Sequence, residues 1–282
     1  MQTLATVAIF ALVRSPEDGW MVLGLQGAGS FLSALVCLGL AYRREARFRW
    51  PTFRSAWDTL RSSRGLFLYR TAIGLYGTTN TLVLGFLAPV QFVAFYAGAD
   101  KIIKPFLRLM DPITAVLNPR ANNLVYTAQS KAARLARRGT LGMFAAGLVS
   151  ALTVSLLAPL LVRLALGSGF QSAVPVLRML SILLPVLGIS IPLSQQWMVP
   201  LGLDHLLTRI TISAAPIHLV LAAILGSRVA ELGVAWALVA TETYIVLAIW
   251  VVLLQRQLNP FTYSASTCGV EMPQLGGSHD AD

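Results

Sequence analysis

The chain has 282 residues, of which 56% are hydrophobic and 12% are charged, and its mean hydropathy is +0.68. Soluble domains carry roughly 25% charged residues, so this composition excludes an ordinary soluble protein and indicates an integral membrane protein. The net charge of +10 does not indicate nucleic-acid binding, because the basic residues lie between apolar runs instead of gathering on a polar domain.

Apolar runs of about 20 residues predict membrane-spanning helices. The sequence holds a short run at 1–13 and longer runs at about 20–41, 66–87, 89–117, 141–163, 174–199, 210–227 and 232–254. We therefore predict an all-α, polytopic membrane helix bundle of about eight transmembrane helices, because helices satisfy every backbone group within lipid. A break is expected near Ala88-Pro89, with Pro89 opening the next helix.

The distribution of basic residues predicts the orientation of these helices. The connection 42–65 holds seven arginines against one Glu and one Asp, and 118–140 adds five basic residues. The alternate connections are nearly bare of basic residues. The positive-inside rule therefore places 42–65, 118–140, 200–209 and the C-terminal tail in the cytoplasm.

Two polar regions flank the predicted spans. Within 42–65, Phe53, Trp57 and Leu60 recur at i, i+4 and i+7 beside arginines, which predicts a helix lying at the inner membrane surface. The simpler interpretation is a topology signal that also attracts anionic lipids. The tail after Pro260 is polar and rich in small residues, which predicts disorder.

The segment ADKIIKPFLRLMDP, residues 99–112, places several ionisable groups in an apolar region: Asp100, Lys101, Lys104, Arg108 and Asp111. The last four follow i, i+3, i+7 and i+10 and share one helix face, while Asp100–Lys104 and Arg108–Asp111 have pairing distances of i+4 and i+3. An unpaired charge at the bilayer centre costs roughly 2.5–3.5 kcal/mol, so these groups should face protein, water or the inner interface. The surplus positive charge would attract an anion into a wet cavity, or Arg108 and Asp111 extend to the membrane interface while the rest form a structural ion network.

The helix before this segment offers a second polar surface. Arg70, Gly74, Gly77, Asn80 and Thr81 fall on one side, where small residues permit close helix approach and Asn and Thr can line a cavity. Arg70 either joins this surface or extends to the membrane interface.

Later spans carry further polar groups. LPVLGISIPLSQQWMVP, residues 184–200, interrupts an apolar helix with prolines and polar side chains, as transporter interiors do, although helix packing explains it equally well. Arg178, His218 and Glu242 are isolated, and for each we expect a structural role with a satisfied partner.

Residues 80–124, NTLVLGFLAPVQFVAFYAGADKIIKPFLRLMDPITAVLNPRANNL, carry a family resemblance. The features are LG before a short outer loop, FYAGADKI, a helix with a proline, and the Pro119-Arg120 pair at the cytoplasmic exit. This pattern resembles the seventh-to-eighth helix region of polysaccharide-biosynthesis flippases, in the multidrug/oligosaccharidyl-lipid/polysaccharide exporter superfamily. The resemblance covers roughly residues 1–255.

The resemblance implies a domain organisation. Family members have at least twelve helices in two six-helix lobes around a cleft, joined by a basic cytoplasmic linker. By analogy, 1–41 is the last two helices of a first lobe, 42–65 the linker, 66–254 a complete six-helix second lobe, and 255–282 a disordered cytoplasmic tail. Four first-lobe helices are missing from this pattern, so we expect a truncated product, a misplaced start codon, or a half that needs a partner.

The resemblance also implies a function. Such proteins flip undecaprenyl-pyrophosphate-linked oligosaccharide across the bacterial inner (cytoplasmic) membrane for surface polysaccharide assembly, with cationic residues holding the pyrophosphate. A multi-pass protein with a cytoplasmic C-terminus is implied. The predicted substrate-binding residues are Arg70, Asn80, Lys101, Lys104 and Arg108, with Asp100 and Asp111 as supporting ion pairs.

Three other functions compete with this hypothesis. A drug or cation antiporter of the same superfamily would bind cations with intramembrane acids, and a non-transporting membrane partner in a polysaccharide assembly complex would explain the missing helices. An enzyme is not expected, because the outer loops are short and the sequence shows no paired carboxylates or metal-ligand cluster. We expect no cofactor, metal or nucleic acid. The expected partners are the lipid-linked oligosaccharide, membrane lipids, and a polysaccharide polymerase or other assembly proteins.

Overall fold

The computed structural model describes residues 19–44 and 52–262 of the chain. Within those residues the chain forms eight α-helices and no β-strand, which confirms the prediction of an all-α membrane protein. The chain divides into two compact units, residues 1–62 and 63–282. The short apolar run predicted at 1–13 lies outside the described residues.

The first unit contains α2 (Gly19–Arg44) and the first turns of α3 (Phe53–Leu87). Helix α2 covers the predicted run at 20–41 and presents exposed apolar side chains between Phe31 and Leu40. The rings of Phe53 and Trp57 stack with centroids 6.5 Å apart, and both side chains are exposed. The helix predicted from this spacing is therefore present, with its apolar groups on one exposed side.

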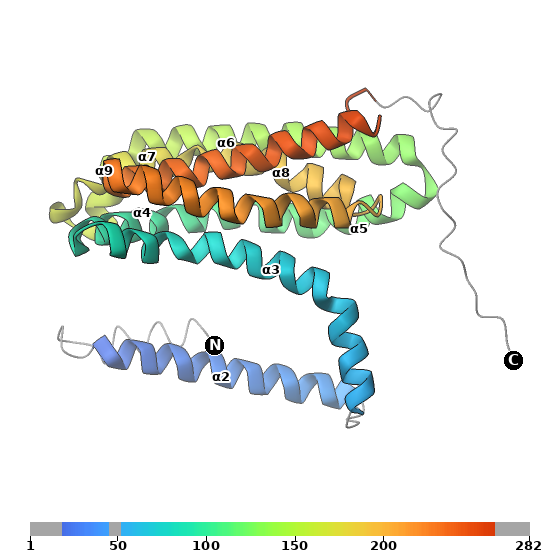
Figure 1. Ribbon diagram of the computed structural model, residues 1–282, viewed down its shortest axis with the longest axis horizontal. Coiled ribbons are helices and arrows are strands. Elements are labelled where there is room, and N and C mark those ends of the chain that lie inside the picture. Colours follow the sequence, from blue (N-terminus) through green and yellow to red (C-terminus); the bar gives the residue numbers. More distant parts are fainter. Residues whose placement is uncertain (1–18, 45–51, 263–282) are drawn as a thin grey trace, which may run out of the picture. The chain divides into compact units, whose positions relative to one another are not determined.

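The second unit contains the rest of α3 and six further α-helices (Figure 1). They are α4 (Val90–Arg108), α5 (Asp111–Thr127), α6 (Gln129–Leu166), α7 (Ala173–Ser181), α8 (Leu183–Ile191) and α9 (Asp204–Gln255), with a short 3₁₀ helix η2 (Ser168–Phe170) and a π-helix η3 (Pro192–Met198). Three helical segments in the described chain are long and apolar enough to cross a membrane: Gln129–Leu166, Ala173–Met198 and Asp204–Gln255.

Prolines explain where the helices divide. The predicted break at Ala88-Pro89 is confirmed, because α3 ends at Leu87 and α4 begins at Val90. The run 89–117, expected as one span, is instead split between α4 and α5. Pro105 lies inside α4 and Pro112 near the start of α5, and each removes a backbone N–H donor, so the regular hydrogen-bond ladder stops between them.

Helix α9 is one long element with a sharp break inside it. Ala230 adopts φ 46° and ψ −123°, and Val229 beside it is also non-helical. This break falls between the runs 210–227 and 232–254, which were predicted as separate spans. The first and second halves of α9 therefore correspond to those two predicted helices.

The segment after α8 widens into a π-helix. The backbone N–H of Val199 donates to the carbonyl of Ser194, five residues earlier, over 2.9 Å. The Ser194 hydroxyl donates to the Ser190 carbonyl over 2.7 Å. Pro192 has no N–H to offer, so the ladder shifts register here, and such π-bulges are frequent at functional sites.

Two glycines let α6 and α8 approach each other to backbone contact. A Cβ added at Gly147 would lie 2.5 Å from the Leu184 carbonyl oxygen, and one added at Gly188 would lie 2.5 Å from that of Met143. Small residues at helix crossings have this role in membrane bundles. At Gly74 of α3, by contrast, an added Cβ meets no described atom within 4 Å.

The chain after α9 returns to the core. The Trp197 indole Nε1–H donates to the Leu258 carbonyl over 2.7 Å, and the Phe261 ring packs against Trp250. Trp197 is fully buried, and Asn259 is 6% exposed. Residues 258–261, within the tail at 255–282 that was predicted to be disordered, therefore pack against the helices.

Candidate functional site

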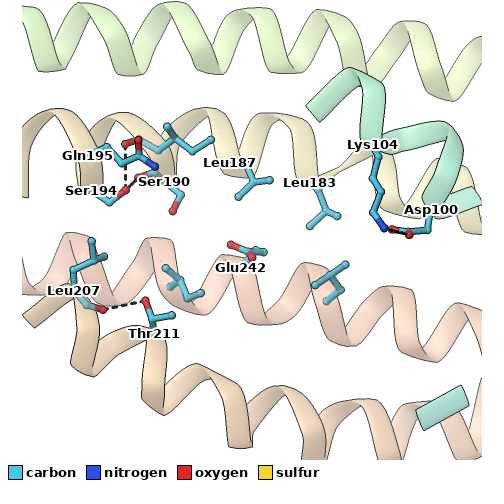
Figure 2. Close-up of a pocket in the computed structure, with 13 residues that line it drawn as sticks. Asp100, Lys104, Leu183, Leu187, Ser190, Ser194, Gln195, Leu207, Thr211 and Glu242 are labelled. Atoms are coloured by element: carbon cyan, nitrogen blue, oxygen red, sulfur yellow. Dashed lines mark hydrogen bonds and ion pairs between the residues drawn. The ribbon is translucent and has the colours of Figure 1, made fainter. Parts of the chain in front are cut away.

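A pocket of about 340 Å³ lies inside the second unit, between α4, α8, η3 and both halves of α9 (Figure 2). Its aliphatic lining residues are Leu183, Leu187, Ile191, Leu207, Leu238 and Ile245. Its polar and charged lining residues are Asp100, Lys104, Ser190, Ser194, Gln195, Thr211 and Glu242. Ligand sites combine an apolar lining with a few oriented polar groups, so this pocket has the composition of a binding site.

The polar side chains gather at two ends of the pocket (Figure 2). Asp100 and Lys104, from α4, lie at one end, and the polar residues of α8 and η3 lie at the other. Leu183 lies between the two ends, and Glu242 faces the pocket from the second half of α9. The arrangement suits an elongated ligand with polar groups at both ends and along one side.

The α4 end is an ion pair. Lys104 Nζ lies 2.5 Å from Asp100 Oδ2, which confirms the pairing predicted from their i, i+4 spacing. The Lys104 side chain is 53% exposed and that of Asp100 is 23% exposed, so the pair lies at the edge of the pocket. An exposed pair of this kind adds little stability, which leaves the ammonium available to a ligand.

Hydroxyl groups near the other end donate hydrogen bonds to backbone carbonyls. Ser194 Oγ donates to the Ser190 carbonyl over 2.7 Å, and Thr211 Oγ1 donates to the Leu207 carbonyl over 3.0 Å. Each hydroxyl oxygen keeps lone pairs that can accept a hydrogen bond from a ligand. The Gln195 amide oxygen accepts a bond from Asn118 Nδ2 over 3.2 Å, so its Nε2 group is the part that can donate.

The sequence interpretation underestimated Glu242. We expected only a structural role for this residue, and its side chain, 8% exposed, also lines the pocket. The signal was available, because Glu242 is the one acid within the apolar run 232–254, and ionisable groups inside membrane spans are functional candidates by default. Thr211 had no comparable signal, since it follows no polar pattern in its helix.

The other predicted site residues lie apart from this pocket. Lys101, Arg108 and Asp111 are exposed and are not among the lining residues. Among the described residues, no ion pair joins Arg108 to Asp111. Of the three basic residues predicted on α4, Lys104 therefore lines the pocket, while Lys101 and Arg108 lie outside the lining on either side of it along the helix. The side chain of Arg70, on α3, lies outside the described residues.

Asn80 belongs to a buried polar cluster. Its Oδ1 lies 2.6 Å from Nε2 of His218, whose Nδ1 lies 3.0 Å from Oγ1 of Thr241. Asn80 is 2% exposed, and His218 and Thr241 are fully buried. Tyr96, 1% exposed, carries a buried hydroxyl that interacts with the Asn80 side chain. Asn80 is not among the lining residues of the pocket, and His218 has the satisfied partners expected of it.

Arg178 also has a structural partner. Its Nε–H donates to the Ser155 carbonyl of α6 over 3.2 Å. Pro159 lies four residues after Ser155 and has no N–H, so it cannot supply the donor that this carbonyl would receive in a regular helix. The Arg178 guanidinium replaces that donor.

Comparisons with known proteins agree with the sequence resemblance. Residues 1–125 match the family of polysaccharide biosynthesis proteins. Two curated relatives are each named "Putative O-antigen transporter": one from Shigella dysenteriae is 30% identical over 245 residues, and one from Escherichia coli (strain K12) is 28% identical over 177 residues. No solved structure matches the chain.

The alignments cover more of this chain than of its relatives. The first covers 86% of this chain and 60% of the relative, and the second covers 63% and 43%. The chain thus spans about 60% of the first relative's length. Asp100 and Lys104 fall within the residues matched by the family, whereas Thr211 and Glu242 lie beyond them. The apolar helices of the chain and the names of these relatives indicate a multi-pass bacterial membrane protein, and residues 1–125 are similar to the polysaccharide biosynthesis family.

Proposed function

We propose that the protein transports a lipid-linked oligosaccharide, on undecaprenyl pyrophosphate, across the inner membrane for surface polysaccharide assembly. The observation that carries this proposal is the polar pocket between apolar helices, in a chain that aligns over 86% of its length with a relative named as an O-antigen transporter. A pocket lined by hydrogen-bond acceptors, beside exposed basic groups, can hold both parts of such a headgroup, the sugar and the pyrophosphate. Both relatives are named transporters, and no enzymatic activity is proposed.

The basic stripe of α4, formed by Lys101, Lys104 and Arg108, is the proposed pyrophosphate site. All three side chains are exposed, and their i, i+3, i+7 spacing places them along one side of the helix. Charge-assisted hydrogen bonds to phosphate are about twice as strong as neutral ones, and ammonium and guanidinium groups supply them. The substrate-binding roles of Arg70 and Asn80, and the pairing role of Asp111, stay predictions.

An orientation follows from where the connections lie. Figure 1 shows the α5–α6 junction, the start of α9 and the end of α9 at one end of the second unit. The α3–α4 turn, η2 and the break in α9 lie at its other end. The first end carries the basic residues of 118–140, so the positive-inside rule makes it cytoplasmic, together with the C-terminus.

One observation favours a drug or cation antiporter as a second candidate. The pocket lining carries two carboxylates, Asp100 and Glu242, against the single ammonium of Lys104. Intramembrane acids are what a cation carrier needs. Transport of an organic cation, unaffected by loss of the basic stripe, would favour this alternative.

The test is made at the chromosomal gene of the native organism. Lys101→Ala combined with Lys104→Ala should abolish surface polysaccharide on immunoblots, while the protein remains in the membrane fraction and lipid-linked oligosaccharide accumulates inside. The matched control is Arg163→Ala with Arg228→Ala, which removes two exposed basic groups carried by other helices. Normal surface polysaccharide in the lysine variant would remove the basic stripe from the mechanism.

A further inference from the structure

The hydrogen-bonding groups of the pocket do not suit a pyrophosphate. An ionised phosphate only accepts hydrogen bonds, and so do ionised carboxylates. The pocket lining holds two acidic side chains, Asp100 and Glu242, against one ammonium, that of Lys104, which is already paired with Asp100. Like charges at close range are unfavourable, particularly where apolar walls lower the effective dielectric constant. With two acids against one paired base, the pocket lining is a poor match for an anionic phosphate.

Among the neutral polar side chains of the pocket, two hydroxyl oxygens are available to a ligand only as hydrogen-bond acceptors. The hydroxyls of Ser194 and Thr211 donate hydrogen bonds to backbone carbonyls, so their oxygens can only accept a hydrogen bond from a ligand. The ligand-directed donors are fewer, namely the Lys104 ammonium, the Gln195 amide and the Ser190 hydroxyl. A matching ligand must supply several donors and also accept from a few groups.

A sugar ring has this combination. Each hydroxyl donates one hydrogen bond and accepts others, and the C–H face of the ring packs on aliphatic surface. The walls supply that surface through Leu183, Leu187 and Leu238, and a volume of about 340 Å³ is at the lower end of the range of about 300–1,000 Å³ for small-ligand sites.

We propose that this pocket binds a sugar residue of the transported oligosaccharide, neutral or bearing an amine, through Glu242, Thr211, Ser194 and Gln195. The inference rests on the proposed transport function and deepens it. It assigns the two parts of the headgroup to different places: the sugar lies in the pocket, and the pyrophosphate lies along the basic stripe outside. Lys104, at the pocket edge, is the group that both parts can reach.

The test measures ligand binding to the purified full chain in lipid nanodiscs by saturation-transfer NMR. The probes are methyl glucopyranoside, its 2-amino analogue, inorganic pyrophosphate, and tetraethylammonium, an organic cation without hydroxyls. Wild-type protein should bind at least one glycoside, and pyrophosphate should not compete with it. Failure of both glycosides to bind, competition by pyrophosphate, or displacement by tetraethylammonium would each overturn the assignment.

Variants locate the binding. Thr211→Val keeps the side-chain shape, and combined with Glu242→Gln it should weaken glycoside binding about tenfold or more while pyrophosphate binding stays unchanged. The control is Thr243→Val, because Thr243 makes the same bond to a backbone carbonyl, of Val239, but is exposed and outside the pocket lining. Ser194→Ala provides a milder pocket change should the double variant misfold. Unchanged glycoside binding in Ser194→Ala and Thr211→Val would overturn the proposal.

This experiment separates the two proposals. Loss of surface polysaccharide in the lysine variant, with glycoside binding insensitive to the pocket variants, would keep the transport function and remove the sugar site. Normal surface polysaccharide in the lysine variant would count against the transport mechanism whatever the glycosides do.

Discussion

Nε2 of His218 lies 2.6 Å from Oδ1 of Asn80 and ties the first half of α9 to α3, two segments 138 residues apart in sequence. The pair is buried on both sides, and the second imidazole nitrogen reaches Thr241 in the other half of α9. Three helical segments therefore meet at one imidazole ring. A buried network whose members are mutually satisfied fixes the relative position of the helices that carry it.

The first prediction concerns this link. Asn80→Ala should lower the free energy of unfolding by about 1–3 kcal/mol, because it leaves a buried imidazole nitrogen without its partner. Thermal unfolding in detergent, followed by circular dichroism, measures the effect. Asn123→Ala, at an exposed position of α5, is the control and should change little. Unchanged stability with lost transport would instead support the predicted role of Asn80 in substrate binding.

The second prediction concerns the crossing of α6 and α8. Gly188→Ala should destabilise the protein by about 1–3 kcal/mol, because its new Cβ would lie 2.5 Å from the Met143 carbonyl oxygen, which belongs to rigid helix backbone. Gly142→Ala in α6 is a control of opposite sign, since nothing lies within 4 Å of an added Cβ there. Alanine favours helix over glycine by up to about 1 kcal/mol, so this control should be neutral or stabilising. Equal unfolding temperatures for the two variants would contradict the close approach.

The third prediction tests the partnership of Arg178 with α6. Arg178→Met should cost about 0.5–1.5 kcal/mol, because the Ser155 carbonyl loses its donor. In a Pro159→Ala background, the restored N–H of residue 159 should supply that donor, so the same Arg178 change should cost less. A double-mutant cycle of unfolding free energies measures the difference. Additive effects of the two changes would show that the guanidinium does not replace the missing backbone donor.

The sequence predicted the helices well where one physical signal dominates. Apolar runs located α2, α6 and both halves of α9, and Pro89 marked the turn after α3. The division between α4 and α5 was missed because it depends on two prolines acting together. In a hydropathy profile, Pro105 and Pro112 are only two residues within a long apolar stretch. In the backbone, each of them removes an N–H donor from the helical hydrogen-bond ladder.

The site was harder to predict than the fold, because a pocket is assembled by segments far apart in sequence. The i, i+4 spacing predicted the Asp100–Lys104 pair, since both residues lie on one helix. Nothing local indicates that Thr211 and Glu242, on either side of the break in α9, line the same pocket, or that Asn80 lies beside His218. Those relations depend on tertiary packing, which helical periodicity does not encode.

The last prediction concerns Gln196, which is fully buried in η3 while neither of its amide atoms has a hydrogen-bond partner among the described residues. An unpaired buried amide costs about 1–3 kcal/mol, so Gln196→Met, of similar length, should raise the unfolding free energy by about 1 kcal/mol. Gly139→Ala should lower it, because the new Cβ would lie 2.5 Å from Gln196 Oε1. Thermal unfolding of the two single variants and of the double variant measures both effects.

In the Gln196→Met background, the penalty of Gly139→Ala should shrink, because a methionine side chain adapts to a crowded space more readily than a planar amide does. An unchanged penalty would mean that the added Cβ meets something other than the Gln196 amide. A loss of stability in Gln196→Met alone would mean that the amide is satisfied by a bound polar group. The π-helix η3 would then contain a second polar binding site, at Gln196, beside the pocket.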